Sequence, residues 1–166
     1  MTWLSALLSC LHTAGKAIWF FFPAYVANAT PVVLGGGKPI DLGKKFIDGR
    51  RILGDGKTFR GFILALAAGT LVGAFQARPV LGLIMSLGAM LGDMAVSFLK
   101  RRLGMERGAP LPVGDQLDFV AGAVALTNLV TVIPLDYIIA IVVVTPPIHL
   151  GTNALAYVLG LKERPW

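Results

Sequence analysis

The sequence predicts an all-α integral membrane protein with five transmembrane helices, two long cytoplasmic loops and a single membrane domain over residues 1–166. Composition, the spacing of apolar runs and the placement of charge all predict this class. Of the 166 residues, 55% are hydrophobic and 14% are charged, and the mean hydropathy is +0.73. Soluble domains of this length are less apolar. The chain is therefore expected to be embedded in a membrane.

Five apolar runs are each long enough to cross a membrane as a helix, which takes about 17 residues or more. A signal peptide would not be followed by four more such runs, so the first run is also predicted to span. The predicted spans cover residues about 2–29, 61–77, 79–99, 117–133 and 137–160, with loops at about 30–60 and 100–116.

Basic residues lie almost entirely on one side of this topology. Thirteen of the 15 Lys and Arg residues fall in the two long loops or in the tail after residue 160, and the exceptions are Lys16 and Arg78. By the positive-inside rule, the two loops and the C-terminus are cytoplasmic and the N-terminus is outside. The formal net charge of +6 then indicates a basic cytoplasmic face for lipid headgroups or phosphates, and no nucleic-acid module.

The first span and the loop after it carry unusual polar residues. Lys16 lies inside the span, and the sequence leaves open whether it faces a polar cavity, contacts a lipid phosphate, extends to the boundary or pairs within the bundle. The loop is rich in glycine and charge, which favours short extended pieces and turns on the membrane face. Its segment 54–58 lacks the preceding strand and leading glycine of a P-loop. Its backbone N–H groups, with Lys57, Thr58 and Arg60, still suit phosphate binding.

The later spans are predicted from packing and from helix-breaking residues. The second and third spans form a hairpin about Arg78, and small residues on them permit close packing. In the fifth span, Pro146 and Pro147 must break or bend the helix. His149 and Asn153 lie four residues apart beyond the prolines, on one polar face, and His149 is interpreted as a core histidine before a catalytic one.

The strongest functional signal lies between residues 92 and 119, where acids flank a basic loop. A carboxylate within hydrocarbon costs at least about 2.5 kcal/mol unless it is paired or wetted, and carboxylates beside cations suit Mg²⁺ and phosphate. The alternative is a structural ion pair between Asp93 and Lys100, with Asp115 as a helix N-cap. The residues concerned are Asp93, Ser97, Lys100 and Arg101 on one face of the third span, and Asp115 and Asp118 at the start of the fourth.

The order of these residues resembles the C-terminal signature of the phosphatidate cytidylyltransferases, which make CDP-diacylglycerol. Two features of the bacterial signature differ, because Glu106-Arg107 stand where a Lys-Asp pair is expected and a His-Gly-Gly before the last two acids is missing. The chain is also far shorter than the bacterial enzymes. The matching residues are Gly92-Asp93, Ser97, Lys100-Arg101 and the acids of the segment 115–118.

Both departures, with the loop sequence LGDGKTFRG and the segment ANATPV before it, resemble the archaeal relatives, the CDP-archaeol synthases, over nearly the whole chain. This resemblance implies CTP and an isoprenoid glycerol phosphate lipid, the unsaturated archaetidic acid, as substrates. It implies CDP-archaeol and pyrophosphate as products, and dependence on Mg²⁺. With the topology, it implies a multi-pass enzyme of the cell membrane whose active site is on the cytoplasmic side.

The same resemblance assigns roles to individual residues. The metal-binding acids, also catalytic, are Asp93, Asp115 and Asp118, and the catalytic phosphate contacts are Lys100 and Arg101. Further candidates for binding CTP or lipid phosphates are Lys57, Thr58, Arg60 and Ser97, with Asp55 and Asn28 as weaker ones. One or two metal ions both agree with three acids.

Two alternatives come from other classes of protein. A CDP-alcohol phosphotransferase is partly mimicked by Asp55, Gly56, Arg60 and Gly69, but the two downstream acids of its motif are absent from the second span. A small ion or lipid transporter would use Asp93, Lys16 and His149 along a pathway. A dense cluster of loop cations argues against the transporter, because a conduction path does not need one.

Overall fold

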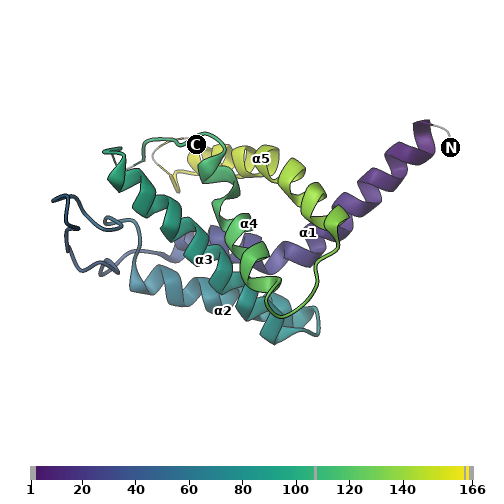
Figure 1. The fold of residues 1–166 in the computed structure, drawn as a ribbon, viewed down its shortest axis with the longest axis horizontal. Coiled ribbons are helices and arrows are strands. Elements are labelled where there is room, and N and C mark those ends of the chain that lie inside the picture. The colour runs from purple at the N-terminus through teal and green to yellow at the C-terminus, as the bar shows by residue number, and fades with distance from the viewer. Residues whose placement is uncertain (1–2, 107, 163, 165–166) are drawn as a thin grey trace.

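The computed structural model describes residues 3–106, 108–162 and 164, and its regular structure in these residues is helical apart from two isolated β-bridges. Arg107, one of the basic residues of the second predicted loop, lies outside the described residues. The described residues form five helices, and Figure 1 shows the loop before α2 at one end and the start of α1 projecting from the other. The helices are α1 (Trp3–Leu34), α2 (Phe59–Phe75), α3 (Pro79–Arg102), α4 (Gly114–Thr127) and α5 (Leu135–Val158).

Three of the five helices are long and apolar enough to cross a membrane by length and composition, namely α1, α3 and α5. The helix α2 is apolar and has 17 residues, which is the lower end of the range for a membrane-spanning helix. The predicted fourth span covers residues 117–133, whereas α4 has 14 residues and ends at Thr127. It is therefore about 21 Å long, against a hydrocarbon core of about 30 Å. The chain turns at Asn128, whose side-chain oxygen accepts a hydrogen bond from the backbone N–H of Ile133.

The helix α1 continues beyond the predicted start of the first loop at residue 30 and ends at Leu34. Pro31 removes one helical hydrogen bond, but its own carbonyl oxygen accepts the N–H of Gly35 at 3.0 Å. The helix stops at Gly36 and Gly37, which both have positive φ, a conformation that glycine adopts without steric cost. The helix thus passes Pro31 and ends at the glycines, four residues beyond the predicted start of the loop.

The prolines of α5 bend the helix and do not end it. Pro146 and Pro147 both lie inside α5, and the ribbon of α5 changes direction along its length in Figure 1. Thr145, just before them, donates a side-chain hydrogen bond to the Ile141 carbonyl oxygen and is hydrogen-bonded to Tyr25 of α1 at 2.6 Å. These bonds hold the middle of α5 against α1.

The core joins four helices through buried apolar side chains, with Phe21 from α1, Met85 from α3, Phe119 from α4 and Ile141 from α5. Each of these side chains is at most 1% exposed. The exposed surface is also apolar, as expected for helices that face lipid. Burial therefore fixes how the helices pack, and lipid can cover the remaining faces.

Glycines let α3 and α4 approach each other closely. A Cβ atom on Gly92 of α3 would collide with the carbonyl oxygen of Asp118, and one on Gly122 of α4 would collide with that of Gly88. Small residues at helix contacts of this kind are typical of membrane bundles. The contact places the first turns of α4 against the part of α3 that carries Asp93.

The substitution Gly122→Ala tests this contact. The added methyl group has no space beside the Gly88 carbonyl oxygen, so the helices must separate, at a cost of about 1–3 kcal/mol. We expect a lower midpoint of thermal unfolding in detergent. Gly151→Ala is the matched control, since nothing lies within 4 Å of a Cβ atom there. Equal midpoints for the two variants would contradict the proposed role of the contact.

Candidate active site

Asp41 organises the loop between α1 and α2. It is 6% exposed and accepts hydrogen bonds from the backbone N–H groups of Gly43, Leu53 and Gly54 at 2.9–3.1 Å. The Arg51 guanidinium donates to both of its oxygens, at 2.6 and 3.2 Å. The Arg51 interaction holds the pKa of Asp41 well below its usual value, although burial opposes this shift. The carboxylate therefore closes a glycine-rich segment that contains too few apolar residues to form a core.

The loop is attached to the C-terminal end of α3 by two arginines. Arg102 pairs with Asp48 at 2.8 Å, and its guanidinium carbon lies within 5 Å of the ring centroids of Phe46 and Phe98. In return, Arg50 donates a hydrogen bond to the Arg102 carbonyl oxygen at 2.5 Å. A cation at this position is favourable because the last carbonyls of a helix carry partial negative charge. The loop thus has a defined place on α3.

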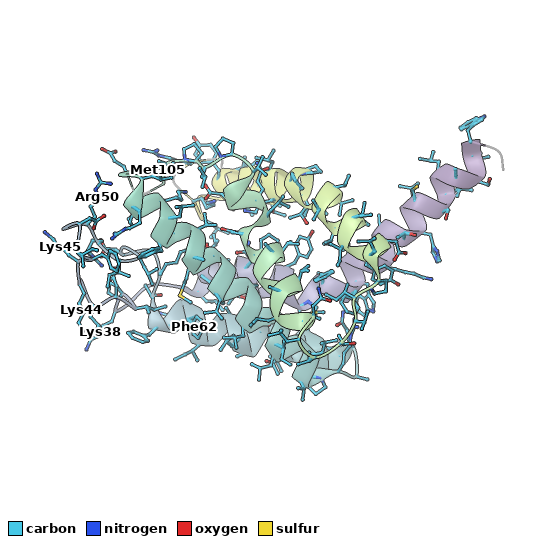
Figure 2. All side chains as sticks on the ribbon, in the orientation of Figure 1. Lys38, Lys44, Lys45, Arg50, Phe62 and Met105 are labelled. Atoms are coloured by element: carbon cyan, nitrogen blue, oxygen red, sulfur yellow. The ribbon has the colours of Figure 1, made fainter. Side chains whose placement is uncertain are left out.

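The attachment gathers cations at one end of the molecule. Figure 2 shows Lys38, Lys44, Lys45 and Arg50 at this end, around the loop before α2. The last turn of α3 adds Lys100, Arg101 and Arg102. This end of the molecule is therefore suited to anions.

A cavity of about 170 Å³ lies between the loop and the end of α3. It is smaller than the roughly 300 Å³ or more of a complete small-molecule pocket, so its size suits phosphate groups. Within the described residues, the buried Nε atom of Arg101 has no hydrogen-bond partner. The cavity is lined by Leu53, Gly54, Asp55, Gly56 and Lys57 of the loop, by Ser97, Lys100 and Arg101 of α3, and by Gly108.

Two lysines of this cavity hold two of the predicted acids. The Nζ atom of Lys57 lies 2.5 Å from Asp93. The Nζ atom of Lys100 lies 2.8 and 2.9 Å from the two oxygens of Asp115, which also accepts the N–H of Leu111. The alternative ion pair between Asp93 and Lys100 is therefore wrong, because each lysine has a different carboxylate nearer to it.

The third acid, Asp118, is buried on α4, with 8% of its surface exposed. Its side chain accepts a hydrogen bond from the N–H of Phe119 at 2.6 Å, and Asp93 and Asp115 lie near enough to act on its charge. Three carboxylates close together repel one another unless cations separate them. The lysines provide that neutralisation in this arrangement.

The donor set suits a magnesium ion, although the acids do not form a ready-made cage. Across residues 3–106, 108–162 and 164, no three His, Cys, Asp or Glu side chains are arranged to hold a metal ion. Asp93, Asp115 and Asp118, which the resemblance implies as metal-binding acids, each have a hydrogen-bond donor of their own in this arrangement. Mg²⁺ needs one or two carboxylates and completes its shell with water and substrate oxygens. Asp93 and Asp118 fit that requirement.

Other predicted binding residues divide between the cavity and its surroundings. Asp55 lines the cavity and pairs with Arg51 at 2.7 Å. Thr58 is buried and caps α2 by accepting the N–H of Gly61. Arg60 is exposed, Asn28 is half-buried on α1, and neither lines the cavity. Thr58 therefore stabilises the first turn of α2, directly after Lys57.

The prediction that the backbone N–H groups of the loop glycines bind phosphate is partly wrong. The N–H of Gly54 is already bound to Asp41, so it is not a donor for a phosphate. The sequence interpretation missed Asp41 itself. The available signal was an acid two residues before Gly43, a spacing typical of a side-chain turn.

A polar face of α5 and the tail also reach this region. Lys162 donates a hydrogen bond to Asn153 at 3.0 Å, and Asn153 contacts a ring nitrogen of His149 at 3.2 Å. The His149 ring stacks on Phe119, next to Asp118. Burial lowers the pKa of Lys162, and the charge of Asp115 opposes that change. From the sequence alone, Lys162 indicates only the orientation of the topology.

These features together define a class of protein. Apolar helices long enough to cross a membrane, with a basic cavity and carboxylates at one end, indicate a membrane-embedded enzyme that acts on phosphorylated substrates. A family model described as CarS-like CDP-archaeol synthase matches residues 10–79 and 75–166. The chain belongs to the CDP-archaeol synthase family, and it is a nucleotidyltransferase.

Individual relatives agree over almost their full length. The CDP-archaeol synthase of Methanopyrus kandleri is 49% identical over 161 residues, which cover 92% of this chain and 93% of the relative. That of Thermococcus kodakarensis is 43% identical over 178 residues and covers all of both chains. A solved structure of an intramembrane enzyme for archaeal membrane lipid biosynthesis has a TM-score of 0.71 and 45% identity, covering 83% of this chain and 92% of that one. The phosphotransferase and transporter alternatives find no support in these matches.

The variant Asp41→Asn tests how the loop is held. It keeps one acceptor oxygen, replaces the other by an NH2 donor and loses the charge paired with Arg51, and hydrogen bonds to charged groups contribute about 1.5–3 kcal/mol. We expect faster tryptic cleavage of the loop at neutral pH than in the wild type. Asp136→Asn, on an exposed acid of α5, is the control.

The stability that the Asp41 carboxylate contributes should depend on pH. The folded-state pKa of Asp41 is depressed from its ordinary value near 3.8, so its contribution is complete above that value and is lost as the pH falls through the folded pKa. The difference in unfolding midpoint between wild type and Asp41→Asn should therefore be full at pH 7 and shrink below about pH 4. A difference that grows on acidification would contradict the assignment.

Proposed function

We propose that the protein transfers CMP from CTP to the phosphate of unsaturated archaetidic acid, forming CDP-archaeol and pyrophosphate in a Mg²⁺-dependent reaction. The observation that carries this proposal is the cavity where Lys57, Lys100 and Arg101 meet beside Asp93 and its neighbouring acids. Family membership supports the same reaction.

The chemistry requires charge control more than a strong base. The lipid phosphate is already an anion, and it attacks the α-phosphorus of CTP while the bond to the β-phosphate oxygen breaks and pyrophosphate leaves. Positively charged groups aligned on the non-bridging oxygens stabilise this transfer. Lys57, Lys100 and Arg101 are the groups proposed for this task.

The two lysine–carboxylate pairs suggest how substrate would be accommodated. In the arrangement described, Lys57 and Lys100 neutralise Asp93 and Asp115. A triphosphate in the cavity would offer these lysines stronger anionic partners and leave the carboxylates available. Mg²⁺ held by Asp93 and Asp118, with Asp115 adjacent, would neutralise charge developing on the phosphate oxygens.

The proposed orientation places this end of the molecule in the cytoplasm. Both long loops, which carry most of the basic residues, lie at the end where CTP would arrive. The lipid would enter beside the bent α5, where His149, Asn153 and Lys162 lead toward the acids. A water-soluble nucleotide and a lipid headgroup would then meet at the membrane boundary.

The variant Asp118→Asn tests the role of the acids. Removing the charge should reduce transfer of label from radioactive CTP into lipid by more than about 100-fold, as expected when metal-assisted stabilisation of the transition state is lost. Chelation of divalent ions should abolish transfer by the wild type. Asp136→Asn, far from the cavity, should keep full activity. Normal turnover by Asp118→Asn would refute the assignment.

The variant Arg101→Gln tests the phosphate cavity. Loss of one charge-assisted hydrogen bond of about 1.5–3 kcal/mol should raise the KM for CTP roughly 10-fold to 100-fold. Lys44→Gln, on an exposed residue of the same basic end, is the control for overall charge. Initial rates over a range of CTP concentrations give the comparison, and equal KM values for the two variants would place CTP elsewhere.

A further inference from the structure

A second cavity lies at the opposite end of the bundle from the proposed nucleotide site. Its volume is about 390 Å³, more than twice that of the cavity beside Lys100 and within the size range of small-molecule pockets. Three separate parts of the chain form it: α1, the turn between α2 and α3, and the first turn of α5. The lining residues are Lys16, Trp19, Phe20, Gln76, Arg78 and Tyr137.

The two cavities are separated by about the thickness of a membrane. Arg78 immediately precedes α3, and Lys100 lies 22 residues later, which at the rise of a helix is about 33 Å. Lys16 lies 18 residues before the end of α1 at Leu34, or about 27 Å. The hydrocarbon core is about 30 Å thick. Lys16 therefore lies about as far from the loop end of the bundle as Arg78 does.

The cavity has positive charge without a matching acid. Arg78 donates its Nε–H to Gln76 at 3.2 Å, and its guanidinium carbon lies 4.7 Å from the Phe20 ring centroid. Among the residues that the structure describes, neither of the two terminal nitrogens of Arg78 has a hydrogen-bond partner, and no Asp or Glu lines the cavity. Burial lowers the pKa of Arg78, and the charge of Tyr137 opposes this change. A half-buried cation in this setting lacks a counterion.

The walls of the cavity favour an amphiphilic occupant. Trp19 and Tyr137 are aromatic residues of the kind that gather where a membrane meets water. Around the α2–α3 turn, Phe75 is 88% exposed and Val80 is 70% exposed, so apolar surface adjoins the cations. A phosphate joined to a hydrocarbon chain matches both features, whereas a free anion uses only the charge.

We propose that Lys16 and Arg78 bind the phosphodiester headgroup of an anionic membrane lipid, in the leaflet opposite the nucleotide site. The lipid is not the substrate, since it lies a membrane thickness away from Lys100. Its chains lie against the exposed apolar residues of the α2–α3 turn, and its phosphate neutralises the two cations. This inference does not rest on the proposed reaction, because it concerns different residues and a different end of the molecule.

The experiment compares lipid binding by the full chain and by Lys16→Gln/Arg78→Gln in neutral detergent. Native mass spectrometry counts bound phosphatidylglycerol, and the unfolding midpoint is followed while this lipid is added. Phosphatidylglycerol is a phosphodiester and so does not imitate a phosphomonoester substrate. We expect the wild type to retain the lipid and to be stabilised by several degrees, and the double variant to bind at least 10-fold more weakly. Lys38→Gln/Lys44→Gln, at the other end, should behave as wild type.

Three results would overturn the proposal. Equal binding of phosphatidylglycerol by wild type and double variant would show that the two cations are not involved. Equal stabilisation by phosphatidylcholine would show that apolar surface alone binds the lipid. Equal stabilisation by inorganic phosphate would assign the cavity to a soluble anion. If the double variant does not fold, Lys16→Gln replaces it, because Lys16 is exposed and its substitution leaves the contacts of Arg78 intact.

Discussion

The close approach of α3 and α4 is the constraint on which the rest of the structure depends. Gly92 and Gly122 leave no room for a side chain between the helices, and this brings Asp118 of one helix near Asp93 of the other. Carboxylates held together in surroundings with little water are costly unless cations neutralise them. The packing of α3 against α4 thus brings negative charges together, and Lys57 and Lys100 neutralise them.

One of the neutralising lysines, Lys57, comes from a segment 36 positions away from Asp93 in the sequence. Lys57 reaches Asp93 because two local devices fix its position: the loop closed on Asp41 before it, and the helix start capped by Thr58 after it. The arginines that attach the loop to α3 keep this arrangement in place. The region beside the acids is therefore as much a product of the loop as of the membrane helices.

The two ends of the bundle handle positive charge differently. At the loop end, Lys57 and Lys100 are paired with acids, which is suited to exchanging partners. At the other end, Lys16 and Arg78 share a cavity with aromatic side chains, which is suited to a stable contact at the membrane boundary. The same residue types thus serve different chemistry, because Asp93 and Asp115 pair with the lysines at the loop end, whereas no Asp or Glu among the described residues lines the other cavity.

The sequence by itself determined the membrane class, five helices and the stretch that carries the acids and cations, because hydropathy and residue spacing are local properties. It also indicated that Ser97, Lys100 and Arg101 share a face of α3, and all three line the same cavity. The tertiary structure alone decided which lysine meets which acid, the short extent of α4 and the burial of Asp41. These depend on contacts between segments distant in sequence, such as Lys57 with Asp93 across 36 positions. Such contacts arise from backbone packing and loop closure, which no local pattern encodes.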